Sequence, residues 1–355
     1  MNRLYRDLLE LLDEGTPCAL ATVVSTQGST PQKAGAQALF AVDGRLFGTV
    51  GGGCLEMEVR RQALSCLSTG QPTTLDLRLD EDVGAEGGLV CGGTAQVFIE
   101  VPTPAQREFY AQVMQVQEQR QPAALATVIK AEARTLIGGH ALLPSEGKPT
   151  LDRLPPTGLE PLQEVASTAL EQGQSRLLEA TLPEGKAQVY VEPLLPQPVL
   201  LIAGAGHVGK AVAHLGSFLN FEVVVVDDRP EFANPQRIPE ANRLLVADIA
   251  STIANWPIDS DTYIVIVTRG HRYDADALRA CIQSQAAYLG MIGSRRKVKL
   301  IFDQLLTEGT ATPEQLARVH APIGLPLGGD TVEEIALSIA AELVAVRNER
   351  REVRS

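Results

Sequence analysis

The chain is poor in cysteine and aromatic residues, and it has no long apolar run. Aromatic residues make up 4% of its 355 residues, and the five cysteines form no Cys-x-x-Cys pair. This odd, scattered set excludes a disulfide framework and predicts a reducing cytoplasmic location. No apolar run reaches the ~18 residues of a membrane span. The first 15 residues have the spacing of an amphipathic helix and not of a signal peptide.

Basic residues are also in deficit. There are 31 Lys and Arg against 43 Asp and Glu, a net charge of −12. This balance argues against general binding of nucleic acid or of an anionic membrane, although a local basic patch can still hold one small anion. Hydrophobic residues make up 45% of the chain, which is typical of a globular protein long enough for two or three domains.

The N-terminal half contains two pairs of similar segments. PCALATVVS at 17–25 resembles PAALATVIK at 122–130, and AQVFIEV at 95–101 resembles AQVYVEP at 187–193. Each member of the first pair follows a helix-like stretch. We therefore predict an N-terminal α/β domain over residues 1–195. It would consist of two similar lobes, about 1–103 and 104–195, whose strands share one sheet.

The C-terminal half alternates strand-like and helix-like segments after a proline-rich linker at 192–198. Near-continuous Val, Ile and Leu runs are typical of parallel strands buried on both faces. We expect strands at 199–204, 221–227, 243–248, 262–268, 287–293 and, as a short piece, near 321–325. The fold class is therefore α/β, with a Rossmann-type doubly wound parallel sheet over residues 196–355.

A glycine-rich turn opens this second domain. Gly204, Gly206 and Gly209 follow the first strand, with His207 between them, and a helix-like stretch comes next. In such a turn the glycines allow a tight bend, close approach of a pyrophosphate and helix–strand packing. Asp227 ends the second strand, where an acid would accept hydrogen bonds from ribose hydroxyls. The alternative is a glycine turn kept for packing alone.

Further candidate ligand contacts lie in loops that should follow other strands of this sheet. Arg229 can take a 2′-phosphate or stack on a base, or it can be an ordinary surface arginine. His271 can donate a proton or contact a phosphate, although a lone loop histidine more often does neither. The remaining candidates are Thr268, Arg269, Gly293, Ser294, Arg295 and Arg296. Cations at a helix start oppose the helix dipole, and a bound anion would relieve that cost.

The first lobe holds two cysteines flanked by glycine. Cys54 follows Gly52 and Gly53 at the start of a helix-like stretch, and Cys91 precedes two glycines before a strand. A cysteine at a helix N-terminus can become nucleophilic. The alternative is a small buried core residue. We interpret Cys54 and Cys91 as sulfur- or cofactor-handling residues. The other three cysteines lie in helix or strand patterns and are interpreted as structural: Cys18, Cys66 and Cys281.

Motifs along most of the chain resemble the XdhC/CoxI family of xanthine dehydrogenase accessory proteins. They are GSTP…GA (28–36), GTVGGGCLE (48–56), VCGGTAQVFIE (90–100), GAGHVGKAVA (204–213), VVVVDDRPEFAN (223–234), VTRGHRYDADAL (267–278), AAYLGMIGSRRK (286–297) and HAPIGL…EEIALSIAAE (320–342). The resemblance implies a protein that binds molybdenum cofactor and assists its sulfuration by a cysteine desulfurase. It would then deliver the cofactor to a xanthine-dehydrogenase-type molybdenum hydroxylase.

The resemblance further implies a homodimer, an N-terminal α/β domain with a C-terminal Rossmann domain, and roles for Cys54, Cys91 and the Gly204–Gly209 turn. We expect the two thiols to face that turn across the bound cofactor. The form of the molybdopterin stays open, as does any catalytic turnover. One alternative is an NAD(P)-dependent oxidoreductase with His271 as a candidate acid, although no Tyr-x-x-x-Lys pair accompanies the turn. Another is a nucleotide-sensing module without chemistry.

Overall fold

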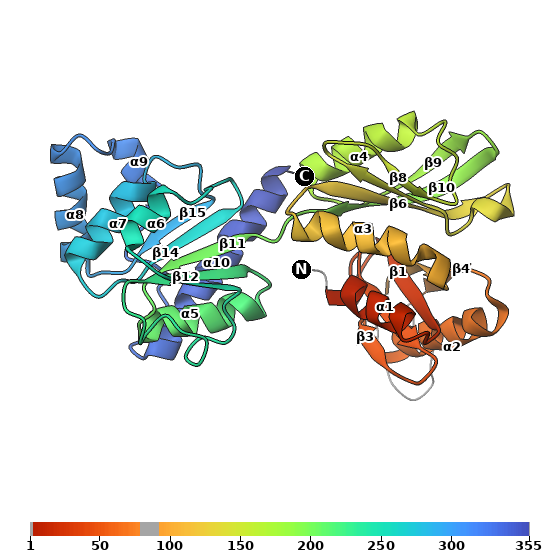
Figure 1. Ribbon diagram of the computed structural model, residues 1–355, viewed down its shortest axis with the longest axis horizontal. Helices are drawn as coiled ribbons and strands as arrows, with labels where there is room; N and C mark the ends of the chain where they lie inside the picture. The colour runs from red at the N-terminus through yellow and green to blue at the C-terminus, as the bar shows by residue number, and fades with distance from the viewer. Residues whose placement is uncertain (1–2, 79–91, 355) are drawn as a thin grey trace. The chain divides into compact units, whose positions relative to one another are not determined.

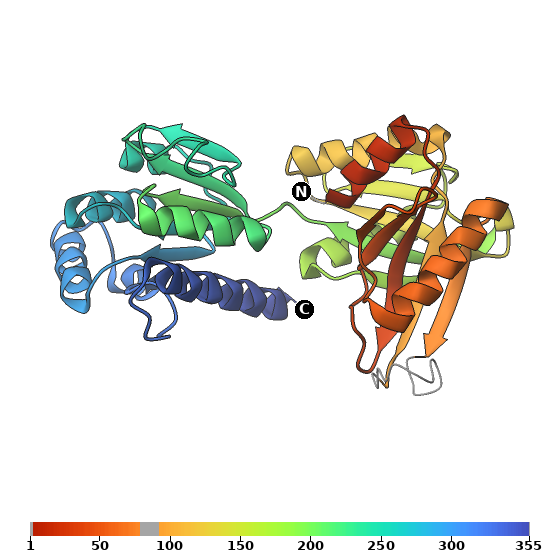
Figure 2. The ribbon, with the colours of Figure 1, turned by 90° about the horizontal axis from the view of Figure 1, so that it is seen from below.

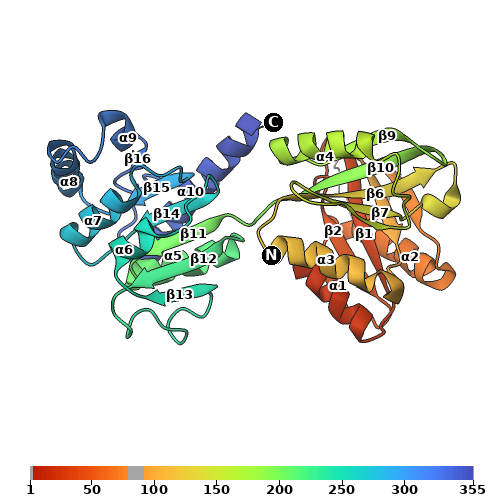
Figure 3. The ribbon, with the colours of Figure 1, turned by 45° about the horizontal axis from the view of Figure 1, so that its top comes forward.

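The computed structural model describes residues 3–78 and 92–354. Two compact units divide the chain, one up to Pro196 and one over Gln197–Val353. Figures 1 and 3 show the elements of both units. In the part of the chain that is described, no helix is long and apolar enough to cross a membrane.

The first lobe of the N-terminal unit is a five-stranded antiparallel sheet with two helices. Its elements are α1 (Arg3–Asp13), β1 (Cys18–Gln27), β2 (Gln37–Ala41), β3 (Leu46–Gly48), α2 (Gly53–Thr69), β4 (Thr73–Arg78) and β5 (Thr94–Glu100). The strand order is β3-β2-β1-β5-β4. Alternate residues of β1 point to opposite faces. Ala19 and Val23 pack in the core that includes α2, whereas Leu20 packs in the core that includes α1.

The second lobe repeats this arrangement. It runs through η1 (Pro104–Gln106), α3 (Arg107–Glu118), β6 (Ala123–Ala131), η2 (Arg134–Leu136), β7 (His140–Pro144), β8 (Thr150–Asp152), α4 (Glu160–Gln172), β9 (Arg176–Leu182) and β10 (Gly185–Leu194). The order β8-β7-β6-β10-β9 matches that of the first sheet strand by strand. The two lobes therefore have the same topology.

The expectation that both lobes share one sheet is wrong, because their strands form two separate five-stranded sheets. Each repeat already supplies hydrogen-bonding neighbours to both sides of its central strand, β1 or β6. Helix α1 lies beside α3 (Figure 2), and side chains of both lobes meet in a core that includes Leu8, Leu20, Val113 and Leu125.

The second unit has the predicted α/β fold, a parallel sheet in the order β13-β12-β11-β14-β15-β16. Its elements are β11 (Val199–Ala203), α5 (His207–Phe218), β12 (Glu222–Asp227), β13 (Arg243–Val246), α6 (Ile249–Ala254), β14 (Thr262–Ile266), α7 (His271–Cys281), β15 (Tyr288–Met291), α8 (Arg295–Thr307), α9 (Pro313–Ala317), β16 (Val319–His320) and α10 (Val332–Arg354). Leu200 and Leu201 of β11 point to opposite faces and lie in separate cores, which identifies a doubly wound sheet.

Candidate functional site

The glycine turn between β11 and α5 has two packing glycines and one open glycine. A Cβ on Gly204 would lie 2.5 Å from the Val267 carbonyl oxygen, and a Cβ on Gly209 would lie 1.9 Å from the Gly204 carbonyl oxygen. Gly206 differs, because apart from its chain neighbours and the backbone of its own helix no described heavy atom lies within 4 Å of the Cβ position there. Gly206 is the N-cap of α5 and provides no side-chain cap. The amides at this helix start are therefore approachable by an anion.

Asp227 lies at the end of β12 and is fully engaged by protein groups. Its Oδ2 accepts the backbone N–H of Ala205 at 2.8 Å. The Arg229 guanidinium donates to both carboxylate oxygens, at 2.8 and 2.9 Å, and lies 3.9 Å from the centroid of the Phe232 ring. Burial raises the pKa of Asp227, but the hydrogen bonds from Arg229 and Ala205 outweigh burial and hold this pKa below its ordinary value.

The loops after β12, β14 and β15 are linked by ion pairs. Arg269 donates to Asp228 Oδ2 at 2.8 Å, which joins the β12 and β14 loops. Thr268 Oγ1 donates to Asp274 Oδ1 at 2.6 Å, and the other oxygen of this buried carboxylate is paired with Lys297. Carboxyl ends of neighbouring parallel strands share one sheet edge, so these predicted residues lie together at the switch point between β11 and β14.

Four of the predicted contacts at this edge are solvent-exposed, and one is a helix cap. His207, His271, Arg295 and Arg296 are exposed at the starts of α5, α7 and α8. The two arginines make no ion pair with any residue that the structure describes, whereas the side chain of Ser294 accepts the Lys297 N–H and caps α8. Two exposed guanidinium groups without ion-pair partners among the described residues favour binding of an anion near the start of α8.

Cys54 directly follows three residues whose backbone conformation only glycine adopts readily. The three residues before it have φ values of 133°, 68° and 57°, for Gly51, Gly52 and Gly53. Cys54 is partly exposed in the first turn of α2, whose N-cap Gly52 offers no side-chain cap. Glu56 closes the loop by accepting a hydrogen bond from Thr49 Oγ1 at 2.7 Å. The thiol and the uncapped helix amides therefore lie in one exposed loop.

The glycine motifs of the first lobe converge around this loop. A Cβ on Gly93 would lie 2.4 Å from the Ser29 carbonyl oxygen, and one on Gly51 would lie 2.9 Å from Pro31 Cβ. The segment 28–31 therefore packs against both 92–93 and 51. Cys91, the second predicted thiol, is outside the described residues. The Cys54 loop and the Gly204 turn belong to different units.

The remaining three cysteines are buried and without disulfide partners, as expected of structural residues. Burial raises the pKa of Cys18 and of Cys281 to about 12, and it also raises the pKa of Cys66. In the described ranges, no group of three or more His, Cys, Asp and Glu side chains is placed to hold a metal ion. Cys54 is thus the one described thiol that is open to an external ligand.

A duplicated antiparallel unit with a glycine–cysteine loop, joined to a Rossmann unit with a glycine-rich turn, defines the class of this protein. Residues 11–78 match the model of the XdhC and CoxI family, and residues 200–343 match the XdhC Rossmann domain. The chain belongs to the XdhC and CoxI family.

Relatives align over nearly the whole chain. Identity is 27% to YqeB of Escherichia coli (strain K12), over 97% of this chain and 46% of that protein, so the chain spans about half of its length. Identity is also 27% to a probable xanthine dehydrogenase subunit of Bacillus subtilis (strain 168), over 98% of both chains. The Escherichia coli molybdenum cofactor insertion chaperone PaoD is 24% identical, over 98% of this chain and 89% of PaoD.

A crystal structure from Bacillus halodurans, described as a xanthine dehydrogenase, has the same fold. It aligns with a TM-score of 0.81 at 23% identity, over 99% of this chain and 98% of that one.

Proposed function

We propose that this protein is an accessory protein that binds molybdenum cofactor and assists its insertion into a xanthine-dehydrogenase-type molybdenum hydroxylase. Two relatives that align over almost the whole chain support the proposal by their names, which describe an insertion chaperone and a probable subunit of xanthine dehydrogenase. The observation that carries it is the partly exposed Cys54, which directly follows three glycines with positive φ. A core cysteine would not require such a backbone.

The Cys54 loop has the chemistry to contact the metal end of the cofactor. Molybdenum cofactor is a phosphorylated pterin dithiolene, and soft thiolates suit such a sulfur-rich centre. The open backbone at Gly52, whose Cβ position has no non-neighbouring atom within 4 Å, lets a large ligand approach the thiol closely. We propose that Cys54 holds the cofactor while a cysteine desulfurase partner supplies sulfur, and that Cys91 shares this role.

The Rossmann turn has the chemistry to contact a phosphate. Its open Gly206 and the amides of α5 can receive an anion. The exposed Arg295 and Arg296, at the start of α8 in the same unit, add positive charge. Such a site would accept the phosphate of plain molybdopterin or the pyrophosphate of a dinucleotide form. We also propose a homodimer, which light scattering of the purified protein will test.

The proposal is tested by cofactor transfer. The protein is purified from molybdenum-replete cells, its bound pterin and molybdenum are assayed, and it is mixed with cofactor-free hydroxylase. We expect both components to co-purify with the protein and xanthine oxidation to appear in the mixture. A protein that carries neither component and does not activate the hydroxylase would refute the proposal.

An NAD(P)-dependent oxidoreductase is the alternative function, and the Asp227–Arg229 pair argues against it. Both carboxylate oxygens that would accept ribose hydroxyls already accept hydrogen bonds from Arg229 and Ala205. We therefore expect no micromolar binding of NADH or NADPH in a fluorescence titration, and no turnover of carbonyl substrates. Arg229→Ala should increase NADH affinity several-fold by freeing the carboxylate. Tight NADH binding by the unmodified protein would instead favour the oxidoreductase.

A further inference from the structure

A small cavity lies between the two lobes of the N-terminal unit, and its lining is duplicated. Fourteen residues line it, and the shared topology of the lobes sorts them into seven equivalent pairs. Thr22 pairs with Gln37 across β1 and β2, as Thr127 pairs with His140 across β6 and β7. The pairs are Tyr5 and Tyr110, Leu20 and Leu125, Thr22 and Thr127, Val24 and Ile129, Gln37 and His140, Phe98 and Tyr190, and Glu100 and Glu192.

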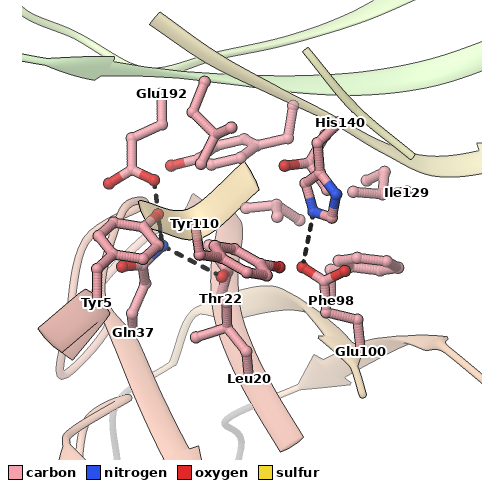
Figure 4. Close-up of a pocket in the computed structure, with 14 residues that line it drawn as sticks. Tyr5, Leu20, Thr22, Gln37, Phe98, Glu100, Tyr110, Ile129, His140 and Glu192 are labelled. Carbon is pink, nitrogen blue, oxygen red and sulfur yellow. Dashed lines mark hydrogen bonds and ion pairs between the residues drawn. The ribbon is translucent and has the colours of Figure 1, made fainter. Parts of the chain in front are cut away.

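Equivalent residues exchange contacts across the cavity. Gln37 Nε2 of the first lobe donates to Glu192 Oε2 of the second lobe at 3.1 Å. His140 of the second lobe lies 3.1 Å from Glu100 Oε1 of the first lobe through its Nε2. Figure 4 shows the two contacts on opposite sides of the cavity. Each lobe therefore reaches the last-strand glutamate of the other, as in an isologous interface.

The second lobe departs from this symmetry by having histidine where the first has glutamine. His140 Nδ1 lies 3.3 Å from Asp152 Oδ2, so both ring nitrogens face carboxylate oxygens. A neutral imidazole can donate through only one nitrogen, whereas an imidazolium donates through both. His140 is 1% exposed and Glu100 5% exposed, so the contact is shielded from water. The geometry therefore favours a protonated ring.

Three residues that line the cavity have a buried polar atom that needs a partner: Glu100, Tyr110 and Tyr190. Glu100 Oε2 and the Tyr110 hydroxyl are buried, and neither has a hydrogen-bond partner among the described residues. Both residues line the cavity, whose volume of about 10 Å³ leaves room for about one water molecule. Buried polar groups of this kind are usually satisfied by an internal water.

We propose that this cavity is an internal proton and water site that clamps the two lobes, with His140 held as an imidazolium between Glu100 and Asp152 and one water on Glu100 and Tyr110. Gln37, its counterpart in the first lobe, clamps the opposite side without a charge. The backbone carbonyl of Gln37 also accepts the N–H of Thr49 at 3.0 Å, so the clamp adjoins the loop that carries Cys54.

The electrostatic surroundings set the pH range of the clamp. Burial alone lowers the pKa of His140, but Glu100 and Asp152 outweigh it and raise this pKa to about 9. Burial raises the pKa of Glu192 to about 7, against the opposing hydrogen bond from Gln37. The titratable or charged groups that surround His140 come from α1, α3, β5, β8, the residue after β8, and β10: Tyr5, Tyr110, Glu100, Asp152, Arg153, Tyr190 and Glu192.

His140 and Glu192 each have a higher pKa in the folded protein than in the unfolded chain, so both groups lower the stability as pH rises. The contribution of His140 to stability is complete below its unfolded pKa of about 6.5 and is lost as pH rises through about 9. Glu192 acts at lower pH, since its contribution is complete below about 4.5 and is lost as pH rises through about 7. The two groups therefore act in separable ranges of pH.

The first test is NMR of protein labelled with ¹⁵N-histidine, in which loss of one signal in His140→Gln assigns the ring among five histidines. We expect both nitrogens of His140 to stay protonated at about pH 8, where exposed histidines are neutral. We also expect a bound water to show cross-relaxation with protons of the cavity residues. A His140 ring that titrates near the ordinary histidine value of about 6.5 would overturn the proposal.

The second test compares hydrogen exchange of β1 and β6 in the unmodified protein and in His140→Gln at matched pH. The variant should fold, because it gives the second lobe the residue that the first lobe already has at Gln37. The measured quantity is the ratio of hydrogen-exchange protection in the unmodified protein to that in the variant. We expect this ratio to fall several-fold between about pH 7 and about pH 10. The control is His214→Gln, which removes an exposed histidine paired with Glu240 and should leave β1 and β6 unchanged. A constant ratio across this range would refute the clamp.

Discussion

Cys54→Ala is expected to lower the molybdenum and pterin that co-purify with the protein by about tenfold or more, which corresponds to about 1.4 kcal/mol of binding free energy or more. Cys54 carries the only partly exposed thiol in the described part of the first lobe, and alanine removes the sulfur without adding bulk. Alanine also fits the first turn of α2, so the fold should persist. Molybdenum is measured by elemental analysis and the pterin by fluorescence of its oxidised form.

The matched control for this variant is Cys66→Ala in the same helix. Cys66 is buried, and burial raises its pKa, so it does not act as an external thiolate. The Cys66→Ala variant should lose a little stability and keep its bound cofactor. If Cys54→Ala keeps full loading, Cys54 is not a cofactor contact, and Cys91→Ala then tests whether the other predicted thiol is the contact.

The Rossmann unit was predictable because its parallel strands are buried on both faces. Continuous apolar runs such as β11 and β14 can be recognised without knowing their neighbours, and the glycine turn marks where the first crossover begins. The last strand was predicted near 321–325 but lies at Val319–His320. Two residues are too few for periodicity to locate a strand.

The pairing of side chains at the sheet edge was not predictable in the same way. The basic turn at 293–297 was visible as a charge cluster, but its Lys297 is paired with the buried Asp274 of another helix. Likewise Asp227 has the position of a ribose acceptor, yet its hydrogen bonds go to Arg229 and Ala205. These hydrogen-bond and ion-pair partners depend on which loops meet in space, and the spacing of residues in the sequence does not show which loops meet.

The duplicated cavity was present in the sequence as a weak signal. The offset of 105 residues between the two PxALATV segments also relates Tyr5 to Tyr110, and the AQV segments relate Glu100 to Glu192. These matches mark equivalent positions, but they do not show that the lobes face each other. Asp152 belongs to a three-residue strand with little pattern of its own, so its contact with His140 required the structure.

The Gly209→Ala and Gly206→Ala variants should separate the folding role of the glycine turn from its ligand role. The Gly209 variant would place a methyl group 1.9 Å from the Gly204 carbonyl oxygen, so helix and strand must move apart at a cost of about 3 kcal/mol or more. Gly206 has an ordinary φ of −63° and open space around its Cβ position. Alanine there should cost less than about 1 kcal/mol, since it only weakens an N-cap.

For ligand binding we expect the opposite order, with the larger loss of affinity in the Gly206→Ala variant. The methyl group of Gly206→Ala would occupy the space where an anion approaches the α5 amides, so phosphate or pterin affinity should fall about tenfold. Trp256, the only tryptophan, packs against the core of the second unit, so urea unfolding followed by its fluorescence reports on this unit. A Gly206 variant that binds its ligand normally would mean that the turn serves packing alone. The accessory function would then depend on the Cys54 loop without a phosphate contact at Gly206.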